Sequence, residues 1–209
     1  MIVCLHGFMD SWRTWDLVRP YLGDVLTPAL PGHLGGRPLR GNFDFASDIE
    51  ALLDEAGLET AHFVGNSLGG YLALVLAARG RAKSVVAFAP AGGADHTETL
   101  ELQERGVTLG HVTARPVPPQ VALNLAAAVR ACDAAPMLAN AREHGWPLDL
   151  SQVTCPVRIV WGLEDRLLPY PRSAEKYRRG LHAEWVELDG VGHAPQLEVP
   201  LEAAQFARM

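Results

Sequence analysis

The sequence lacks the features of a disulfide-rich, metal-binding or redox protein. It has only three cysteines, Cys4, Cys132 and Cys155, which are far apart and without a C-x-x-C pair. This spacing argues against a disulfide framework or a thiolate metal site. We therefore expect reduced thiols, with Cys4 and Cys155 as small buried residues, and neither a metal nor another cofactor.

The chain also lacks a long apolar run and an excess of positive charge. The apolar stretch at residues 71–78 is too short to cross a bilayer, and residues 1–5 have neither the basic start nor the length of a signal peptide. The formal net charge of −6 disfavours a nucleic-acid partner, because phosphate binding needs a concentrated basic surface. These absences predict a cytoplasmic protein that binds neither nucleic acid nor a membrane.

What the chain has is a regular alternation of two patterns. Runs rich in Val, Ile, Leu and Phe predict six strands, at 2–5, 25–27, 61–64, 84–88, 157–161 and 184–188. Helical patterns fall at 12–21, 45–56, 68–79, 171–179 and 198–208. Nearly continuous apolar strands alternating with helices predict a doubly wound, mostly parallel α/β sheet of about six strands. Sites in such sheets lie at the carboxyl ends of the strands.

Residues 91–150 break this alternation. They offer helical stretches at 97–105, 119–132 and 135–144, separated by prolines, and no convincing strand. Because a connection this long usually has a functional reason, we interpret 91–150 as a small helical cap inserted into a core formed by 1–90 and 151–209. The alternative is a second helical layer packed on the sheet.

A sharp turn is predicted at residues 65–70, between a strand and a helix. Its sequence, Gly-Asn-Ser-Leu-Gly-Gly, matches the G-x-S-x-G pattern of a nucleophile elbow, with Ser67 at the centre. Glycines flank the serine because the strained turn leaves no room for side chains. Ser67 is therefore the candidate nucleophile, provided that the chain supplies a base and an acid.

One candidate base and one candidate acid follow later strands. Asp165 comes just after the strand at 157–161, and His193 lies between the last strand and the last helix. The order Ser67, Asp165, His193, each at a carboxyl strand end, predicts a catalytic triad. Glu164 is the alternative acid, and His6 is expected to be a structural loop histidine.

Attack on a carbonyl creates an oxyanion, which needs preorganised N–H donors. The residue after the nucleophile, Leu68, offers one amide at a helix N-terminus, where the dipole also favours negative charge. The loop after the first strand offers the second, and the Phe8 amide is the best candidate because Gly7 permits a close turn.

Four stretches together resemble the signatures of the α/β-hydrolase superfamily: His6-Gly7-Phe8, residues 65–70, residues 162–165, and residues 192–198. Residues 31–35 are similar to its D-x-P-G-x-G-x-S loop, with Ala29 and Arg37 in place of the aspartate and the serine. The resemblance covers essentially the whole chain. It implies the α/β-hydrolase fold without the two N-terminal strands that are usual in the superfamily.

Within that superfamily, Asn66 and the capped layout resemble C–C bond hydrolases of meta-cleavage products and the related lyase SHCHC synthase. Ala194 departs from this pattern, because those enzymes usually carry tryptophan after the histidine. Ser67 separates the chain from haloalkane dehalogenases and epoxide hydrolases, which use aspartate there.

The substrate is expected to be a small molecule lying between Ser67 and the cap. Sequence position places Phe8, Met9, Trp12, Leu68, Pro90 and Leu168 around it, whereas Trp161 is expected in the core or the pocket wall. The cap arginines Arg105, Arg115, Arg130 and Arg142 could meet a substrate carboxylate, but solvated helix faces are favoured for them.

Three functions remain open from the sequence. The first is a serine hydrolase for small esters or thioesters. The second is a C–C bond hydrolase or lyase that uses the same triad, and the third is a ligand-binding protein without turnover. An exposed sheet edge also suggests that the chain forms oligomers.

Overall fold

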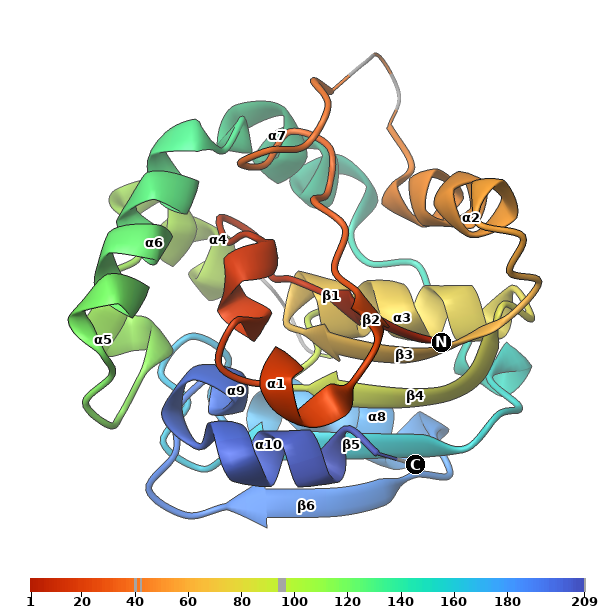
Figure 1. The fold of residues 1–209 in the computed structure, drawn as a ribbon. Coiled ribbons are helices and arrows are strands. Elements are labelled where there is room, and N and C mark those ends of the chain that lie inside the picture. Colours follow the sequence, from red (N-terminus) through yellow and green to blue (C-terminus); the bar gives the residue numbers. More distant parts are fainter. Residues whose placement is uncertain (40, 42, 94–96, 209) are drawn as a thin grey trace.

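A six-stranded parallel sheet organises the molecule (Figure 1). The computed structural model describes residues 1–39, 41, 43–93 and 97–208, with the side chains of 97–99 and 105 outside the described part. The strands are β1 (Ile2–Leu5), β2 (Val25–Leu26), β3 (Ala61–Asn66), β4 (Ala82–Phe88), β5 (Val157–Gly162) and β6 (Glu184–Leu188). Their order in the sheet is β2-β1-β3-β4-β5-β6, and each neighbouring pair is parallel. The predicted α/β fold class is confirmed.

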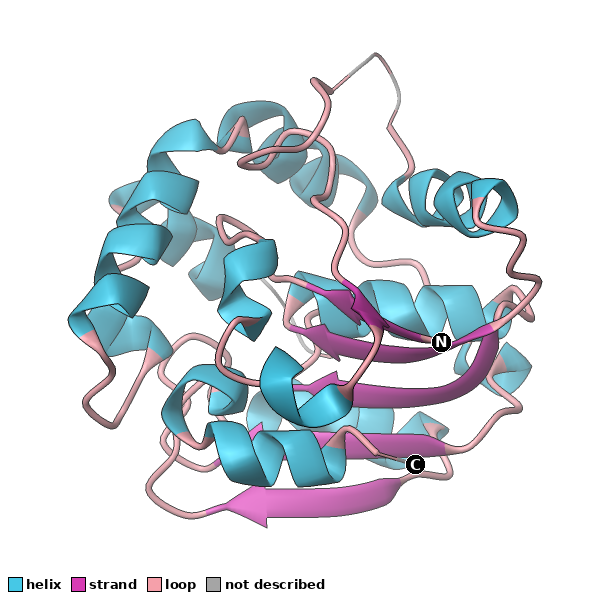
Figure 2. Cartoon of the chain, in the orientation of Figure 1, coloured by secondary structure: helices cyan, strands magenta, loops and turns pink. Residues whose placement is uncertain are grey.

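Helices cover both faces of this sheet (Figure 2). On one face, α2 (Phe45–Glu55), α3 (Leu68–Ala78) and α8 (Glu175–Gly180) pack on Val3, Leu5, Phe63 and Ile159. On the other face, the 3₁₀ helix η1 (Trp12–Trp15) and α10 (Pro200–Phe206) pack on Cys4, Val64, Val86 and Val160. Successive strand residues thus enter opposite cores, as the period of two in a strand requires.

Three helices that the sequence pattern predicted as continuous are divided in the structure, and two of these divisions have a proline beside them. The helix predicted at 12–21 is wrong, because η1 ends at Trp15 and a separate α1 (Arg19–Leu22) carries Pro20 in its first turn. The segment 198–208 is divided between α9 (Pro195–Glu198) and α10, since Val199 precedes Pro200 and leaves the helical region. The segment 171–179 begins as the 3₁₀ helix η3 (Arg172–Ala174) and continues as α8.

The segment between β4 and β5 contains α4 (Thr97–Arg105), α5 (Leu109–Val112), α6 (Pro119–Ala131), α7 (Ala134–His144) and the 3₁₀ helix η2 (Leu150–Gln152). Helices α4 to α7 lie beyond the carboxyl ends of the strands, in green in Figure 1. The short α5 was not among the predicted helices. Residues 91–150 are referred to as the cap.

Within the described part of the chain, no single helix has the length and apolar composition needed to cross a bilayer. The consecutive helices α6 and α7 pass that test only as a pair, and they are bent by 74° where they meet.

The junction of β3 and α3 is packed closely against β1. A Cβ on Gly69 would lie 2.1 Å from the Leu5 carbonyl oxygen, and a Cβ on Gly65 would lie 2.2 Å from the Gly69 carbonyl oxygen. Backbone atoms cannot move aside at such distances, so only glycine allows α3 to approach the sheet this closely. The first turn of α3 is thereby fixed over the end of β1.

We therefore expect Gly69→Ala to destabilise the fold by roughly 3 kcal/mol or more, because overpacking outweighs the better helix propensity of alanine. Gly110→Ala in α5 is the matched control, since its Cβ would meet only Thr108 Oγ1, at 3.9 Å. Urea unfolding of both variants measures the difference. Equal stabilities would contradict the close packing described for Gly69.

Candidate active site

Ser67 lies in the strained turn between β3 and α3. Its backbone has φ 55° and ψ −115°, a region that residues other than glycine rarely adopt. Three backbone bonds hold it there: its N–H donates to the Phe88 carbonyl over 2.9 Å, and its carbonyl accepts from the Ala91 and Tyr71 N–H groups over 3.0 Å each. Strained residues persist only where the surroundings over-determine them, and they are concentrated at functional sites.

Two further residues share this strain near the same edge of the sheet. Met9, in the loop after β1, has φ 57°, and Ala89, directly after β4, has φ 41°. In the described part of the chain, the positive φ angles outside glycine are confined to Met9, Ser67 and Ala89. Backbone strain therefore gathers at the carboxyl ends of β1, β3 and β4.

Asp165 and His193 form a buried pair beside this turn. His193 Nδ1 lies 2.7 Å from Asp165 Oδ2, and both side chains are almost fully enclosed. The second carboxyl oxygen of Asp165 accepts the Leu167 and Leu168 amide hydrogens, at 2.9 and 2.8 Å. An ionised carboxylate only accepts hydrogen bonds, so His193 Nδ1 carries the proton in its bond to Asp165. Glu164, the alternative acid, is exposed.

Ser67 and His193 meet at one small cavity. Both line a space of about 30 Å³, together with Gly7, Phe8 and Asn66. His193 Nε2 is buried and has no hydrogen-bond partner among the described residues, so it does not yet bond to the Ser67 hydroxyl. Such contacts often tighten only when substrate binds. The structure thus brings the three predicted triad residues, Ser67, Asp165 and His193, to one place.

The predicted oxyanion donors belong to residues that lie beside Ser67. A Cβ on Gly7 would lie 3.4 Å from Ser67 Cβ, so the loop after β1 passes directly beside the serine. Phe8 lines the small cavity, and both Phe8 and Leu68 line a larger cavity that also reaches Ser67. Within the described residues, neither the Phe8 nor the Leu68 amide N–H has a backbone carbonyl partner. The Phe8 and Leu68 amides stay the predicted oxyanion donors.

A chain of buried amides holds the backbone of His193, and no sequence pattern indicated it. Asn66 Nδ2 donates to the carbonyl oxygens of His193, at 2.9 Å, and of Phe88, at 3.2 Å. Asn66 Oδ1 accepts from Gln196 Nε2 at 3.1 Å, and Gln196 Nε2 also donates to Thr14 Oγ1 at 3.0 Å. Both N–H bonds of each amide are therefore used, which fixes the two side chains and the histidine loop between them.

The cap holds the same loop from the other side. The His193 N–H donates to the Val112 carbonyl at 2.9 Å. Glu198 accepts from Gly192 N–H at 2.9 Å and from the Ala114 and Arg115 N–H groups at 2.8 Å each. Arg115 then donates to the carbonyl oxygens of Gly190 and Asp189.

The arginines of the cap therefore differ in position. Arg115 follows α5 and bonds the histidine loop, so it does not lie on a helix face, although it is exposed as expected. Arg142 pairs with Glu104 at 2.6 Å, and Arg130 is exposed on α6. The side chain of Arg105 lies outside the described part.

Asp10 is a second carboxyl group near the histidine. It lines the small cavity with Ser67 and His193 and accepts the Ser11 N–H at 2.8 Å. Burial raises the pKa of Asp10 to about 6, although the Ser11 amide, the Thr14 hydroxyl and His193 each lower it. Nothing in the local sequence pattern distinguished this residue from an ordinary loop aspartate.

His6 has a structural position. Its Nε2 accepts the Leu30 N–H at 3.0 Å, so its Nδ1 donates to the Gly7 carbonyl at 2.9 Å. The ring is fully buried, and burial together with His33 lowers the pKa of His6 to about 3. It is therefore neutral and connects the loop after β1 to the loop after β2.

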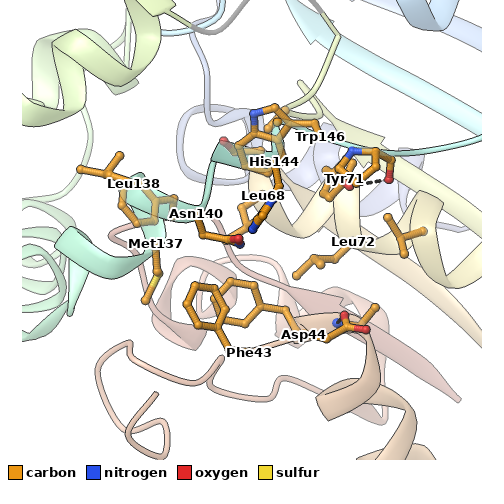
Figure 3. Close-up of a pocket in the computed structure, with 18 of the residues that line it drawn as sticks. Phe43, Asp44, Leu68, Tyr71, Leu72, Met137, Leu138, Asn140, His144 and Trp146 are labelled. Atoms are coloured by element: carbon orange, nitrogen blue, oxygen red, sulfur yellow. Dashed lines mark hydrogen bonds between the residues drawn. The ribbon is translucent and has the colours of Figure 1, made fainter. Parts of the chain in front are cut away.

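The larger cavity, of about 360 Å³, extends from Ser67 between α3 and the cap. Figure 3 shows Leu68, Tyr71 and Leu72 from α3 on one side, Met137 and Leu138 from α7 on the other, and Phe43 below. The lining is mainly apolar. Among the remaining lining residues, the charged or amide-bearing ones and the histidine are Asp44, Arg79, Gln103, Asn140 and His144.

The predicted pocket residues divide between these spaces. Phe8, Leu68 and Leu168 line the larger cavity, and Met9 lines the small one. Trp12 and Pro90 line neither of the two cavities as described, and these predictions are wrong. Trp12 packs against the loop at Gly35, and Pro90 lies behind Gly70 in the first turn of α3. Trp161 is fully buried in the core.

No group of three or more metal-binding side chains occurs among the described residues. The described cysteines are free, and burial raises the pKa of the Cys4 thiol to about 12.

Comparison with known proteins gives concordant matches. A sequence model of the family described as "Alpha/beta hydrolase family" matches residues 2–206. The chain is 31% identical to an epoxide hydrolase, EphH, of Mycobacterium tuberculosis, over 74% of this chain and 87% of that protein. It is 31% identical to a pimeloyl-[acyl-carrier protein] methyl ester esterase of Aromatoleum aromaticum, over 97% and 94%. A solved bacterial membrane phospholipase A superposes with a TM-score of 0.81 and 27% identity, covering 98% of this chain and 76% of that one.

The raised pKa of Asp10 predicts a pH-dependent stability. The pKa of Asp10 in the folded state lies above the ordinary value of 3.8. The natural chain therefore loses folding stability as this carboxyl ionises between about pH 4 and pH 6. Asp10→Asn removes this penalty. We expect its free energy of unfolding, relative to the natural chain, to rise by on the order of 2 kcal/mol between pH 4 and pH 7.5. Urea unfolding at both pH values measures it, and a difference independent of pH would contradict the shift.

The amide chain predicts a cost for removing Gln196. Gln196→Leu leaves the buried Asn66 Oδ1 without its donor, and we expect a loss of about 2 kcal/mol in unfolding free energy. Gln205→Leu on the exposed face of α10 is the matched control, with a change within about 0.5 kcal/mol. Equal effects of the two substitutions would show that Gln196 does not stabilise the histidine loop.

Proposed function

The chain belongs to the alpha/beta hydrolase family, and we propose that it is a serine hydrolase that cleaves ester or thioester substrates through an acyl-enzyme. One observation carries the proposal above all. The buried Asp165–His193 pair leaves His193 Nε2 without a partner among the described residues, and His193 lines a cavity that the strained Ser67 also lines.

In the proposed mechanism, Ser67 Oγ attacks the substrate carbonyl carbon while His193 Nε2 accepts the hydroxyl proton. Asp165 keeps the other ring nitrogen protonated and stabilises the imidazolium that forms. His193 then gives its proton to the leaving oxygen or sulfur, and an ester between Ser67 and the acyl group remains. Water repeats the sequence to release the acid and restore Ser67.

The proposed oxyanion hole consists of the Phe8 and Leu68 amides. Each preorganised donor of this type lowers a barrier by about 3 to 4 kcal/mol. The Leu68 amide also lies at the N-terminus of α3, an 11-residue helix whose dipole favours negative charge. The tight contact of α3 with β1 keeps this amide beside the Phe8 loop.

The lining of the larger cavity favours ester cleavage over the C–C bond alternative. Substrates of C–C hydrolases in this family carry a carboxylate, which needs a cation. The one arginine among the described lining residues, Arg79, is already bonded to Asp44 at 2.8 Å and to Glu50 at 2.9 Å. Asn66 is similarly committed, since both of its N–H bonds go to backbone carbonyls. The esterase relative from Aromatoleum aromaticum supports the same choice.

A ligand-binding protein without turnover has no need of the geometry at Ser67. A positive φ at a non-glycine residue costs of order 1 to 3 kcal/mol, which binding alone would not require. The strain, together with the buried pair, supports an enzyme.

We expect Ser67→Ala to lower kcat/KM for methyl and ethyl esters by at least about a thousandfold, because no other nucleophile replaces the hydroxyl. A fluorophosphonate probe should label the natural chain and fail to label this variant. Ser151→Ala, at the exposed η2, is the matched control and should be labelled and active. Full turnover by Ser67→Ala would refute the proposed nucleophile, whereas turnover of a dienol acid without ester hydrolysis would favour the C–C bond alternative.

A further inference from the structure

Two cavities of very different size meet at Ser67. The larger one, of about 360 Å³, and the smaller one, of about 30 Å³, share Phe8 and Ser67 in their walls. In the tetrahedral intermediate, the former carbonyl carbon is bonded to Ser67 Oγ. Its acyl chain and its alcohol group would therefore enter different cavities. The chemistry of the leaving group decides which substituent enters which cavity.

His193 lines the small cavity and does not line the larger one, as far as the described residues go. In the proposed mechanism, His193 Nε2 must protonate the leaving oxygen at hydrogen-bond distance. The alcohol portion of the ester therefore lies in the small cavity. The acyl portion, which stays attached to Ser67, extends into the larger one.

We infer that the substrate is an ester of a straight, medium-length acyl chain with a methanol- or ethanol-sized alcohol. This inference rests on the proposed serine hydrolase function and specifies its substrate class. A space of about 30 Å³ is about two to three times what a single buried water molecule needs, so it accepts only about two or three non-hydrogen atoms. Apolar cap side chains line it as well, namely Val107, Val112, Leu125 and Val129.

The larger cavity has the shape that a linear chain needs. It follows one face of α3, where Leu68, Leu72, Val75 and Arg79 line it at intervals of three or four residues. With a rise of 1.5 Å per residue, the distance along the helix from Leu68 to Val75 is about 10 Å. An extended chain advances by about 1.2 Å per bond, so eight to ten carbon atoms reach Val75.

The far end of this cavity disfavours an anionic chain terminus. The Arg79 guanidinium bonds to both Asp44 and Glu50, and two carboxylates with one guanidinium leave a net negative charge there. A terminal methyl group meets the apolar wall before this cluster, whereas a terminal carboxylate would approach it. The preferred acyl chain therefore carries no terminal charge.

Two isomeric esters test the assignment. Methyl decanoate and nonyl acetate have the same atoms and the same total chain length, but they place the long chain on opposite sides of the ester. We expect kcat/KM for methyl decanoate to exceed that for nonyl acetate by about tenfold or more. The monomethyl ester of decanedioic acid, with a carboxylate at the far end, should be about tenfold poorer than methyl decanoate.

A substitution in the groove tests the path of the chain. Val75→Trp should lower the ratio of kcat/KM for methyl decanoate to that for methyl butanoate by about tenfold, because the indole obstructs the groove beyond the first carbons. Leu123→Trp, exposed on α6, is the matched control and should leave this ratio unchanged. Thermal unfolding of both variants checks that they are folded.

The outcomes separate the two proposals. Equal rates for the isomers, a preference for nonyl acetate, or a chain-length ratio unaffected by Val75→Trp would overturn the inference. If Ser67 still reacts with the fluorophosphonate probe, the serine hydrolase proposal survives that result. Absence of both labelling and hydrolysis of every ester would overturn the proposed function itself, and the inference with it.

Discussion

The close contact between the first turn of α3 and the end of β1 is the constraint on which the site depends. Side chains are excluded at Gly65 and Gly69, where a Cβ would come within about 2.2 Å of backbone oxygen atoms. This contact places Ser67 at φ 55° and brings its hydroxyl beside the loop that carries Phe8. The strain is offset by backbone bonds from Ser67 to Phe88 and Ala91. A wider separation would move the serine away from the other groups of the site.

The histidine is fixed from three directions by different parts of the chain. Asp165 fixes the ring through Nδ1, and the amide of Asn66 fixes the main-chain carbonyl. The cap binds the same loop through the Val112 carbonyl and through Glu198. Because one loop carries all three connections, the position of the cap and that of the histidine are coupled. A substitution in residues 112–115 is therefore expected to alter the histidine as well as the cavity wall.

Charge is distributed so that the cavities remain largely apolar. Arg79, which could have offered a cation to a substrate, is neutralised by Asp44 and Glu50. Asp10 stands at the opposite, smaller cavity, where burial raises the pKa of its carboxyl group to about 6. The pairing of Arg79 thus removes a free cation from the larger cavity, whereas Asp10 contributes a negative charge at the smaller one once the pH exceeds its pKa.

Much of this architecture follows from local patterns in the sequence. Apolar runs alternating with helical stretches were enough to predict the parallel sheet, and the glycines around Ser67 were enough to predict the sharp turn. The order of Ser67, Asp165 and His193 placed them at one edge, because the carboxyl ends of parallel strands share that edge. Prolines that interrupt a helix, as at Pro20, are equally local signals, but their effect was underestimated for the segment 12–21.

Only the tertiary structure decided which side chains from distant parts of the sequence contact one another. Gln196 and Thr14 are 182 residues apart and are joined by a hydrogen bond, and the hydrophobic periodicity of the sequence does not predict such a contact. Trp12 and Pro90 follow the correct strands, yet neither lines one of the two cavities, because a strand end does not determine which of the following side chains reach the site. The pairing of Arg79 and the division of the site into two unequal cavities depend on how α2, α3 and the cap pack together. The sequence thus determined the fold and the reactive groups, and the packing of distant elements determined the space around them.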